Sequence, residues 1–117
     1  MNSVPDFTES ELWTVRDTLK QRYGHDVEIE MGDAELRLDP HSSTLTPCPV
    51  VFWRDGGGTN FVIFKVGDRR YRSQFFYRVH QQFGTGIDEF DNLAECTVTL
   101  LQVQADHEAK QTAKQDR

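Results

Sequence analysis

Arginine and aromatic side chains crowd residues 69–78, RRYRSQFFYR. Guanidinium groups hold phosphates and stack on bases, and tyrosine or phenylalanine rings on a sheet surface provide stacking platforms. This stretch could therefore bind single-stranded nucleic acid or a small ligand. Its candidate binding residues are Arg69, Arg70, Arg72, Tyr77 and Arg78.

A purely structural role competes with this binding role. Residues 49–79 carry a net charge of +4 while the whole chain carries −6, so the remaining residues hold −10. We expect the first three arginines to be neutralised across the sheet, where opposite charges on neighbouring strands stabilise one another. Their expected partners are Glu28, Glu30 and Glu35. The negative net charge of the whole chain also disfavours a role as a general nucleic-acid-binding protein.

Other chemical groups give weaker signals. Residues 55–59, DGGGT, lack the Lys-Ser/Thr of a phosphate-binding P-loop and are typical of a hairpin tip. His41 and Cys48 share one loop, but no Cys-x-x-Cys or His-x-x-x-His pair is present, so we expect no metal and no cofactor. The same pair lacks an obvious orienting carboxylate, so an enzyme is less favoured than a binding protein.

The clearest element that positions these residues is a helix at 8–23. Residues 8–11, TESE, fit a capping box, and Gly24 provides a left-handed C-terminal cap. An apolar stripe at spacings of three and four should face the core. It consists of Leu12, Val15, Leu19 and Tyr23.

Residues 26–39 alternate between apolar and acidic side chains on both sides of Gly32-Asp33, which predicts a hairpin with an acidic outer face. Residues 40–49 contain three prolines and predict an irregular surface loop. Because Cys48 falls in this loop, we expect its thiol to be exposed and to react faster than that of Cys96.

Residues 49–72 predict an antiparallel meander, because two apolar runs and the arginine-rich run are separated by glycine-containing turns. The meander should form the centre of the sheet and of the core. Eight of the thirteen aromatic residues fall in 49–79. We expect Phe64 in the middle of the sheet, with its ring against a helix.

Two interpretations are open for residues 73–83. Alternation of Phe75, Tyr77 and Val79 favours continuation of the arginine strand, whereas Ser73 could cap a short helix that buries Phe83. A final helix is predicted from about 88 to 108, with Asp88 as its N-cap and Cys96 in the core. The β-branched residues 97–99 count against this helix.

The predicted architecture is α+β: an N-terminal helix, an antiparallel meander sheet of about five strands and a C-terminal helix, with both helices on one sheet face. One domain should cover residues 1–108, followed by a polar, frayed tail at 109–117.

The chain has no apolar run near the about 20 residues needed to span a bilayer, and its N-terminus lacks the features of a secretory signal. We therefore expect a cytoplasmic protein without a membrane partner. The favoured function is a small acidic, non-catalytic interaction module that binds another protein. The alternative is a small-ligand or single-stranded nucleic-acid binder that uses residues 69–78.

Overall fold

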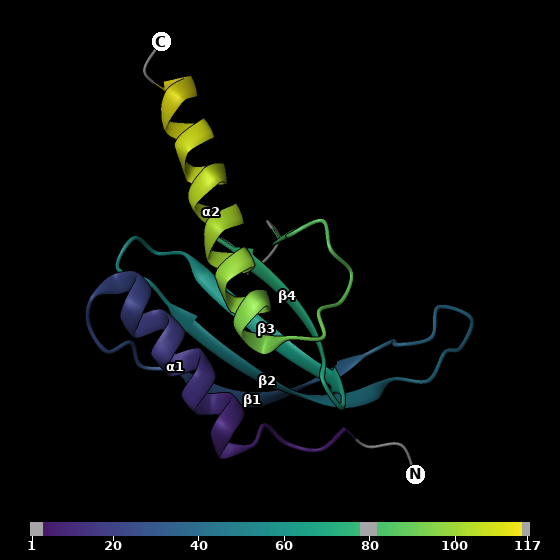
Figure 1. Ribbon diagram of the computed structural model, residues 1–117. Helices are drawn as coiled ribbons and strands as arrows, with labels where there is room; N and C mark the ends of the chain where they lie inside the picture. Colours follow the sequence, from purple (N-terminus) through teal and green to yellow (C-terminus); the bar gives the residue numbers. More distant parts are fainter. Residues whose placement is uncertain (1–3, 78–81, 116–117) are drawn as a thin grey trace.

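Two helices pack on one face of a five-stranded antiparallel sheet in the computed structural model, which describes residues 4–77 and 82–115 (Figure 1). The elements in chain order are α1 (Glu9–Tyr23), β1 (Glu30–Leu36), β2 (Thr46–Arg54), β3 (Asn60–Gly67), β4 (Arg70–Phe76), β5 (Gln82–Gly84) and α2 (Leu93–Gln115). The strands lie in sequence order, each antiparallel to the next, so the sheet is a meander. The α+β architecture predicted from the sequence is confirmed.

α1 forms as its sequence predicts. The Thr8 hydroxyl accepts a hydrogen bond from the Glu11 amide at 3.1 Å, and the Thr8 amide donates to Glu11 Oε1 at 2.8 Å. These two bonds satisfy amide groups that have no partner within the helix. Gly24 ends the helix at φ 79°, a left-handed conformation that glycine adopts without a Cβ clash. The capping box and the C-terminal cap are both confirmed.

α2 begins later and ends later than predicted. Asn92, rather than Asp88, caps it, because the Asn92 side chain accepts from the Glu95 amide at 2.9 Å. Thr97 is fully buried in this helix despite its low helix propensity, and its hydroxyl is satisfied by the Leu93 carbonyl at 2.8 Å. The helix runs on to Gln115, and its C-terminal half projects beyond the sheet in Figure 1.

The core lies between the sheet and the two helices. Leu12, Val15 and Leu19 contribute from α1, and Cys96 and Leu100 contribute from α2. The strands supply alternate side chains to the same cluster, as a sheet with one covered face requires. These strand residues are Val51, Trp53, Phe61, Ile63, Tyr71 and Phe75.

The hairpin predicted for residues 26–39 is wrong. β1 runs straight through Gly32-Asp33, which pair with Val50 and Pro49 of β2. The change in the apolar pattern at Gly32 has another cause. Val27 and Ile29 pack against the core on the helix side, whereas the apolar residues after Gly32 fall on the alternate positions of the strand and so on the other face.

The surface loop predicted for residues 40–49 is shorter than expected, because residues 46–49 belong to β2. Pro47 and Pro49 are accommodated there since this part of β2 pairs with β1 alone; the ladder to β3 begins at Val50. Cys48 is consequently fully buried, and the prediction of an exposed, reactive Cys48 is wrong.

The two interpretations of residues 73–83 are resolved in part. β4 continues as a strand to Phe76, as favoured, and Phe83 lies in the separate strand β5 rather than on a helix. The ring of Phe83 stacks on that of Phe75 with centroids 5.4 Å apart. Val79, the last residue of the predicted alternation, lies outside the described residues.

Candidate functional site

The arginines of β4 are paired within the chain. Arg70 donates to both carboxylate oxygens of Glu89, at 2.8 and 2.9 Å, and Arg72 lies 3.3 Å from the same carboxylate. The hydrogen bonds from Arg70, followed by those from Arg72, hold the pKa of Glu89 below its usual value despite some burial. Arg69 lies in the β3–β4 turn at φ 56° and is exposed.

Neutralisation of the arginines was expected, but the predicted partners are wrong. Glu30 and Glu35 lie on β1, which is separated from β4 by two intervening strands, and Glu28 precedes β1. Strands are about 4.8 Å apart, so these carboxylates are too distant to pair with β4. Glu89 was missed because residues 88–92 were assigned to the last helix, whereas they run beside β4 and pair Phe90 with Tyr71.

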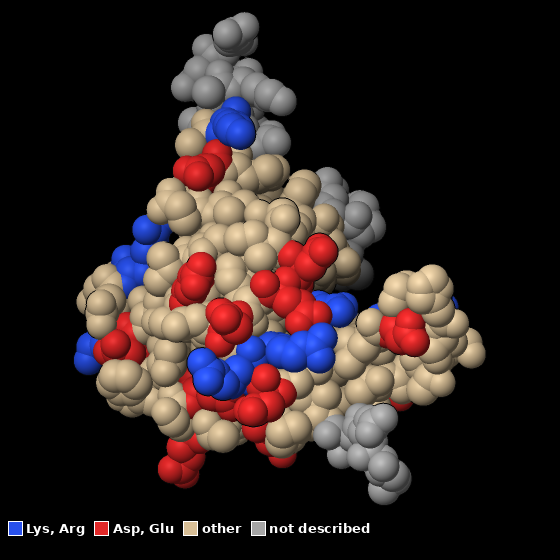
Figure 2. All heavy atoms as spheres, turned by 45° about the vertical axis from the view of Figure 1, so that its right-hand side comes forward, with Lys and Arg blue, Asp and Glu red and all other residues tan. Residues whose placement is uncertain are grey.

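Tyr77 lies away from these arginines, beyond the opposite end of β4. Its hydroxyl is 3.1 Å from His107 Nδ1, and the two rings stack with centroids 5.7 Å apart. Arg78, the last residue of the predicted site, lies outside the described residues. On the face shown in Figure 2, the Lys and Arg atoms border Asp and Glu atoms closely. The predicted residues that the structure describes therefore do not converge on a single site.

A different site emerges on the sheet face opposite the helices, here called the open face. Residues that pair across strands share a face of the sheet. Val62 pairs with Phe52 on one side and with Gln74 on the other. Because Phe61 and Ile63 belong to the core beneath the helices, the alternate residues of β3 lie on the open face. Where β2, β3 and β4 pair with one another, the apolar members of the open face are Val50, Phe52, Val62, Phe64 and Phe76.

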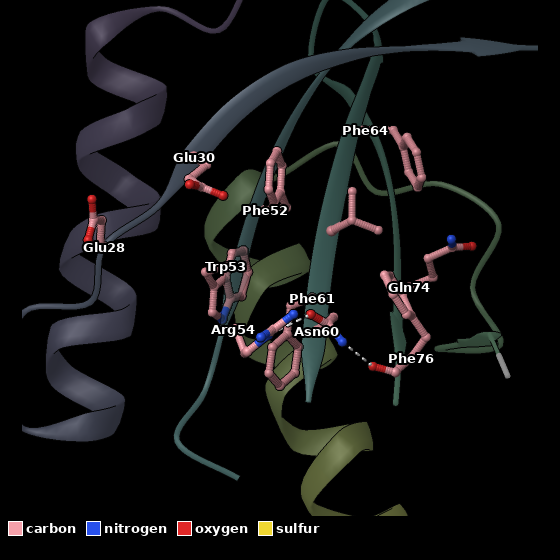
Figure 3. A pocket seen from close by; sticks show the side chains of 11 residues that line it. Glu28, Glu30, Phe52, Trp53, Arg54, Asn60, Phe61, Phe64, Gln74 and Phe76 are labelled. Atoms are coloured by element: carbon pink, nitrogen blue, oxygen red, sulfur yellow. Dashed lines mark hydrogen bonds between the residues drawn. The ribbon is translucent and has the colours of Figure 1, made fainter. Parts of the chain in front are cut away.

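Four of these side chains, all but that of Val50, line a hollow of about 650 Å³, which Trp53 and Phe61 also line. Val62 lines it on the middle strand, between its partners Phe52 and Gln74 on the two neighbouring strands. The longer side chains of Phe52, Phe64 and Phe76 line the same hollow (Figure 3). Phe52 is 37% exposed. Phe64 is in the middle of the sheet as predicted, but its ring faces this hollow and the prediction that it faces a helix is wrong.

Polar groups border the hollow on two sides. Arg54 Nε donates to Asn60 Oδ1 at 3.1 Å, and Asn60 Nδ2 donates to the Phe76 carbonyl at 3.3 Å (Figure 3). These bonds connect β2, β3 and β4 at one end of the hollow. Glu28 and Glu30 lie beside it near β1, and neither carboxylate has a hydrogen-bond or ion-pair partner among the described residues.

A buried ion pair lies on the opposite, helix-covered face of the sheet. Lys65 is 3% exposed, and its amino group lies 2.8 Å from Glu11 Oε1 and 3.0 Å from the Asp6 carbonyl. The Tyr71 hydroxyl donates to Glu11 Oε2. Burial opposes ionisation of Glu11, but the bonds from Lys65, Tyr71 and Thr8 outweigh it, so the pKa of Glu11 lies below its usual value.

This cluster is fully occupied by its own hydrogen bonds, which connect the start of α1 to β3 and β4. Burial, followed by the Glu11 carboxylate, raises the pKa of the Tyr71 hydroxyl, so Tyr71 remains a donor. The arrangement therefore holds the start of α1 against the sheet and does not resemble a ligand site.

The two thiols do not form a chemical site. Cys48 and Cys96 are both unpaired and buried. Burial raises the pKa of both, to about 11 for Cys96, so neither thiol is activated as a nucleophile. Across residues 4–77 and 82–115, no three His, Cys, Asp or Glu side chains are grouped closely enough to bind a metal ion.

No family model, curated protein or solved structure matches this chain. In the part of the chain that the structure describes, neither helix combines the length and the apolar character needed to cross a bilayer. The geometry of the open face is therefore the main guide to function.

The sequence contained a signal for the open face. Residues 50–53 and 61–64 are continuous apolar runs, a pattern typical of strands that bury both faces rather than one. With the helices covering one face, such runs leave the other face apolar.

Proposed function

We propose that this chain is a small acidic interaction module that docks a partner protein on the open face of its sheet. The observation that supports this most strongly is the composition of that face. Antiparallel sheets with one covered face normally present polar side chains to water on the other. Here the three central strands place three phenylalanines and two valines there, with no described helix over them. The phenylalanines are partly or largely exposed, whereas Val50 and Val62 are buried between their neighbours.

An exposed apolar patch rimmed by polar groups is characteristic of an interaction site. The rim residues Glu30, Arg54 and Gln74 fit this description. Two of the arginines that first suggested nucleic-acid binding, Arg70 and Arg72, are engaged by Glu89, which lowers their availability for phosphates. A protein partner is thus better supported than a nucleic acid.

The size of the open face suggests an interface of modest strength. Strands about 4.8 Å apart and rising about 3.4 Å per residue give the five-stranded sheet a face of roughly 500 Å². A standard protein interface buries about 800 Å² per partner. We therefore expect a partner that also contacts the rim, or one that binds transiently.

The test is affinity capture from native host lysate with three tagged forms of the chain. These are the wild type, the Phe52→Gln/Phe76→Gln variant and the control Trp13→Gln, which replaces a 64% exposed aromatic residue on α1. A protein retained by the wild type and the control but lost with the double variant is expected. The retained protein, once purified, must bind the wild type directly. Retention by all three forms, or loss with Trp13→Gln alone, contradicts the proposal.

A small ligand is a second candidate, favoured by the hollow itself. Its volume of about 650 Å³ falls within the range of small-molecule sites, about 300–1,000 Å³. Its walls are aromatic, and the few polar groups at its edge could orient a ligand: Arg54, Asn60 and Gln74. For this candidate, the binding residues are those that line the hollow and not the β4 arginines predicted from the sequence.

A further inference from the structure

We infer that the hollow over Val62 receives a bulky apolar side chain from a cationic segment of the partner, whose lysine or arginine lies against Glu28 and Glu30. This inference rests on the proposed function and specifies the chemistry of the partner. The shape of the hollow, its charges and the net charge of the chain support it.

The shape is that of a socket for a side chain. By its place in the register, the short Val62 on the middle strand forms the floor. The longer side chains of Phe52, Phe64 and Phe76 line the same hollow (Figure 3). Residues that dominate protein interfaces are apolar or aromatic anchors that fill such central pockets, surrounded by groups that exclude water. An inserted aromatic or large aliphatic side chain would contact all three rings and cover the floor.

The charges at the edge specify what flanks this anchor. Glu28 and Glu30 border the hollow near β1 without partners among residues 4–77 and 82–115. Arg54 is held at the other end by its hydrogen bond to Asn60. A cation placed beside the anchor would complement the two carboxylates, and the net charge of −6 would attract a cationic segment from a distance.

The other occupants fit less well. A second copy of the chain presents the same hollow, so two such faces would enclose a void, and each copy would bring its net charge of −6. An uncharged aromatic ligand would leave Glu28 and Glu30 without partners. Both occupants remain outcomes that the experiment can detect.

The probe is a phage-displayed library of random dodecapeptides selected on the immobilised full chain. Enriched sequences are expected to place a bulky apolar residue next to lysine or arginine. Synthetic peptides from the selection are then titrated by fluorescence anisotropy against variants whose fold is checked by circular dichroism. Val62→Phe, which fills the hollow, should weaken binding at least tenfold. Val98→Phe, the same change at a 55% exposed position of α2, should leave it unchanged.

The charges are tested on the same peptides at low salt. Glu28→Gln/Glu30→Gln should weaken binding at least threefold and reduce its dependence on salt. Glu35→Gln is the matched control, because it removes an exposed carboxylate of β1 that points to the other face of the sheet. It should bind as the wild type does.

Three results would overturn the inference. Neutral peptides that are sensitive to Val62→Phe but not to the glutamate variants would refute the cationic partner and leave the proposed function standing. If no peptide is enriched, or if the enriched peptides are insensitive to Val62→Phe, the hollow over Val62 does not receive an apolar side chain and the inference is refuted. The lysate capture then decides separately whether the open face docks a protein. Dimerisation of the chain alone in sedimentation experiments, lost with Val62→Phe, would make the second copy the occupant.

Discussion

Replacing Glu11 with glutamine should strongly destabilise the protein, because it leaves the buried Lys65 without its carboxylate. The side chain of Lys65 is 4% exposed and that of Glu11 is 15% exposed, so water cannot replace the lost interaction. The substitution also replaces the carboxylate oxygen that accepts from the Tyr71 hydroxyl, but it leaves the capping box in place. Glutamine can still accept from the Thr8 amide in the capping box, since glutamine and glutamate both serve at that position.

The magnitude follows from the burial of the pair. Removing one partner of a buried ion pair typically costs about 3–5 kcal/mol, most of it the penalty of an uncompensated buried charge. Glu9→Gln is the matched control, because Glu9 lies in the same first turn but is exposed. It should cost less than about 0.5 kcal/mol. Combining Glu11→Gln with Lys65→Met, which removes the buried charge, should recover a large part of the loss.

Urea unfolding at pH 7 provides the assay. With a slope of about 1.5 kcal/mol per molar urea, the loss of about 3–5 kcal/mol should lower the midpoint of Glu11→Gln by about 2–3 M. Because the pKa of Glu11 is depressed in the folded state, its contribution is complete above the unfolded-state pKa and is lost as the pH falls through the folded-state pKa. The gap between wild type and variant should therefore narrow on acidification. A midpoint within 0.3 M (about 0.5 kcal/mol) of the Glu9→Gln control would refute this account of the pair.

The remaining predictions concern thiols, nucleic acid and the two sides of the sheet. Cys48 and Cys96 should both react slowly with a thiol reagent in the folded protein and rapidly in urea; fast labelling of either in native buffer would contradict their burial. A short single-stranded oligonucleotide should bind more weakly than about 10 μM by anisotropy, and Glu89→Gln, which releases the β4 arginines, should strengthen that binding in low salt. Equal binding by both forms would refute the neutralising role of Glu89. Phe61→Ala, at a fully buried core position, should cost about 3–5 kcal/mol in urea unfolding, while Phe64→Ala on the open face should cost less than half of that. Equal costs would contradict the assignment of Phe64 to the open face.

Local signals in the sequence predicted the elements well. The capping box at Thr8, the stripe from Leu12 to Leu19 and the glycine cap act within one or two turns, so they do not depend on distant residues. The turns of the central meander are equally local. These features were enough to predict the α+β class and the arrangement of the helices.

The site was harder to predict, because it depends on which residues the sheet brings together. The partner of the β4 arginines lies 17–19 residues away in sequence, in the segment before α2. The change in the apolar pattern at Gly32 fits a turn. It fits equally well a straight strand whose apolar residues lie on one face of the sheet before Gly32 and on the other face after it. Only the observed register shows that Phe52, Phe64 and Phe76 surround Val62.

Methyl NMR of the valine-labelled chain, titrated with the partner recovered by affinity capture, tests the central claim most directly. Val50 and Val62 report on the open face, and Val98 reports on the exposed side of α2. If the partner docks on the open face, the methyl signals of Val50 and Val62 should shift while those of Val98 stay in place. Shifts at Val98 with unchanged signals from Val50 and Val62 would place the partner on the helices and contradict the account.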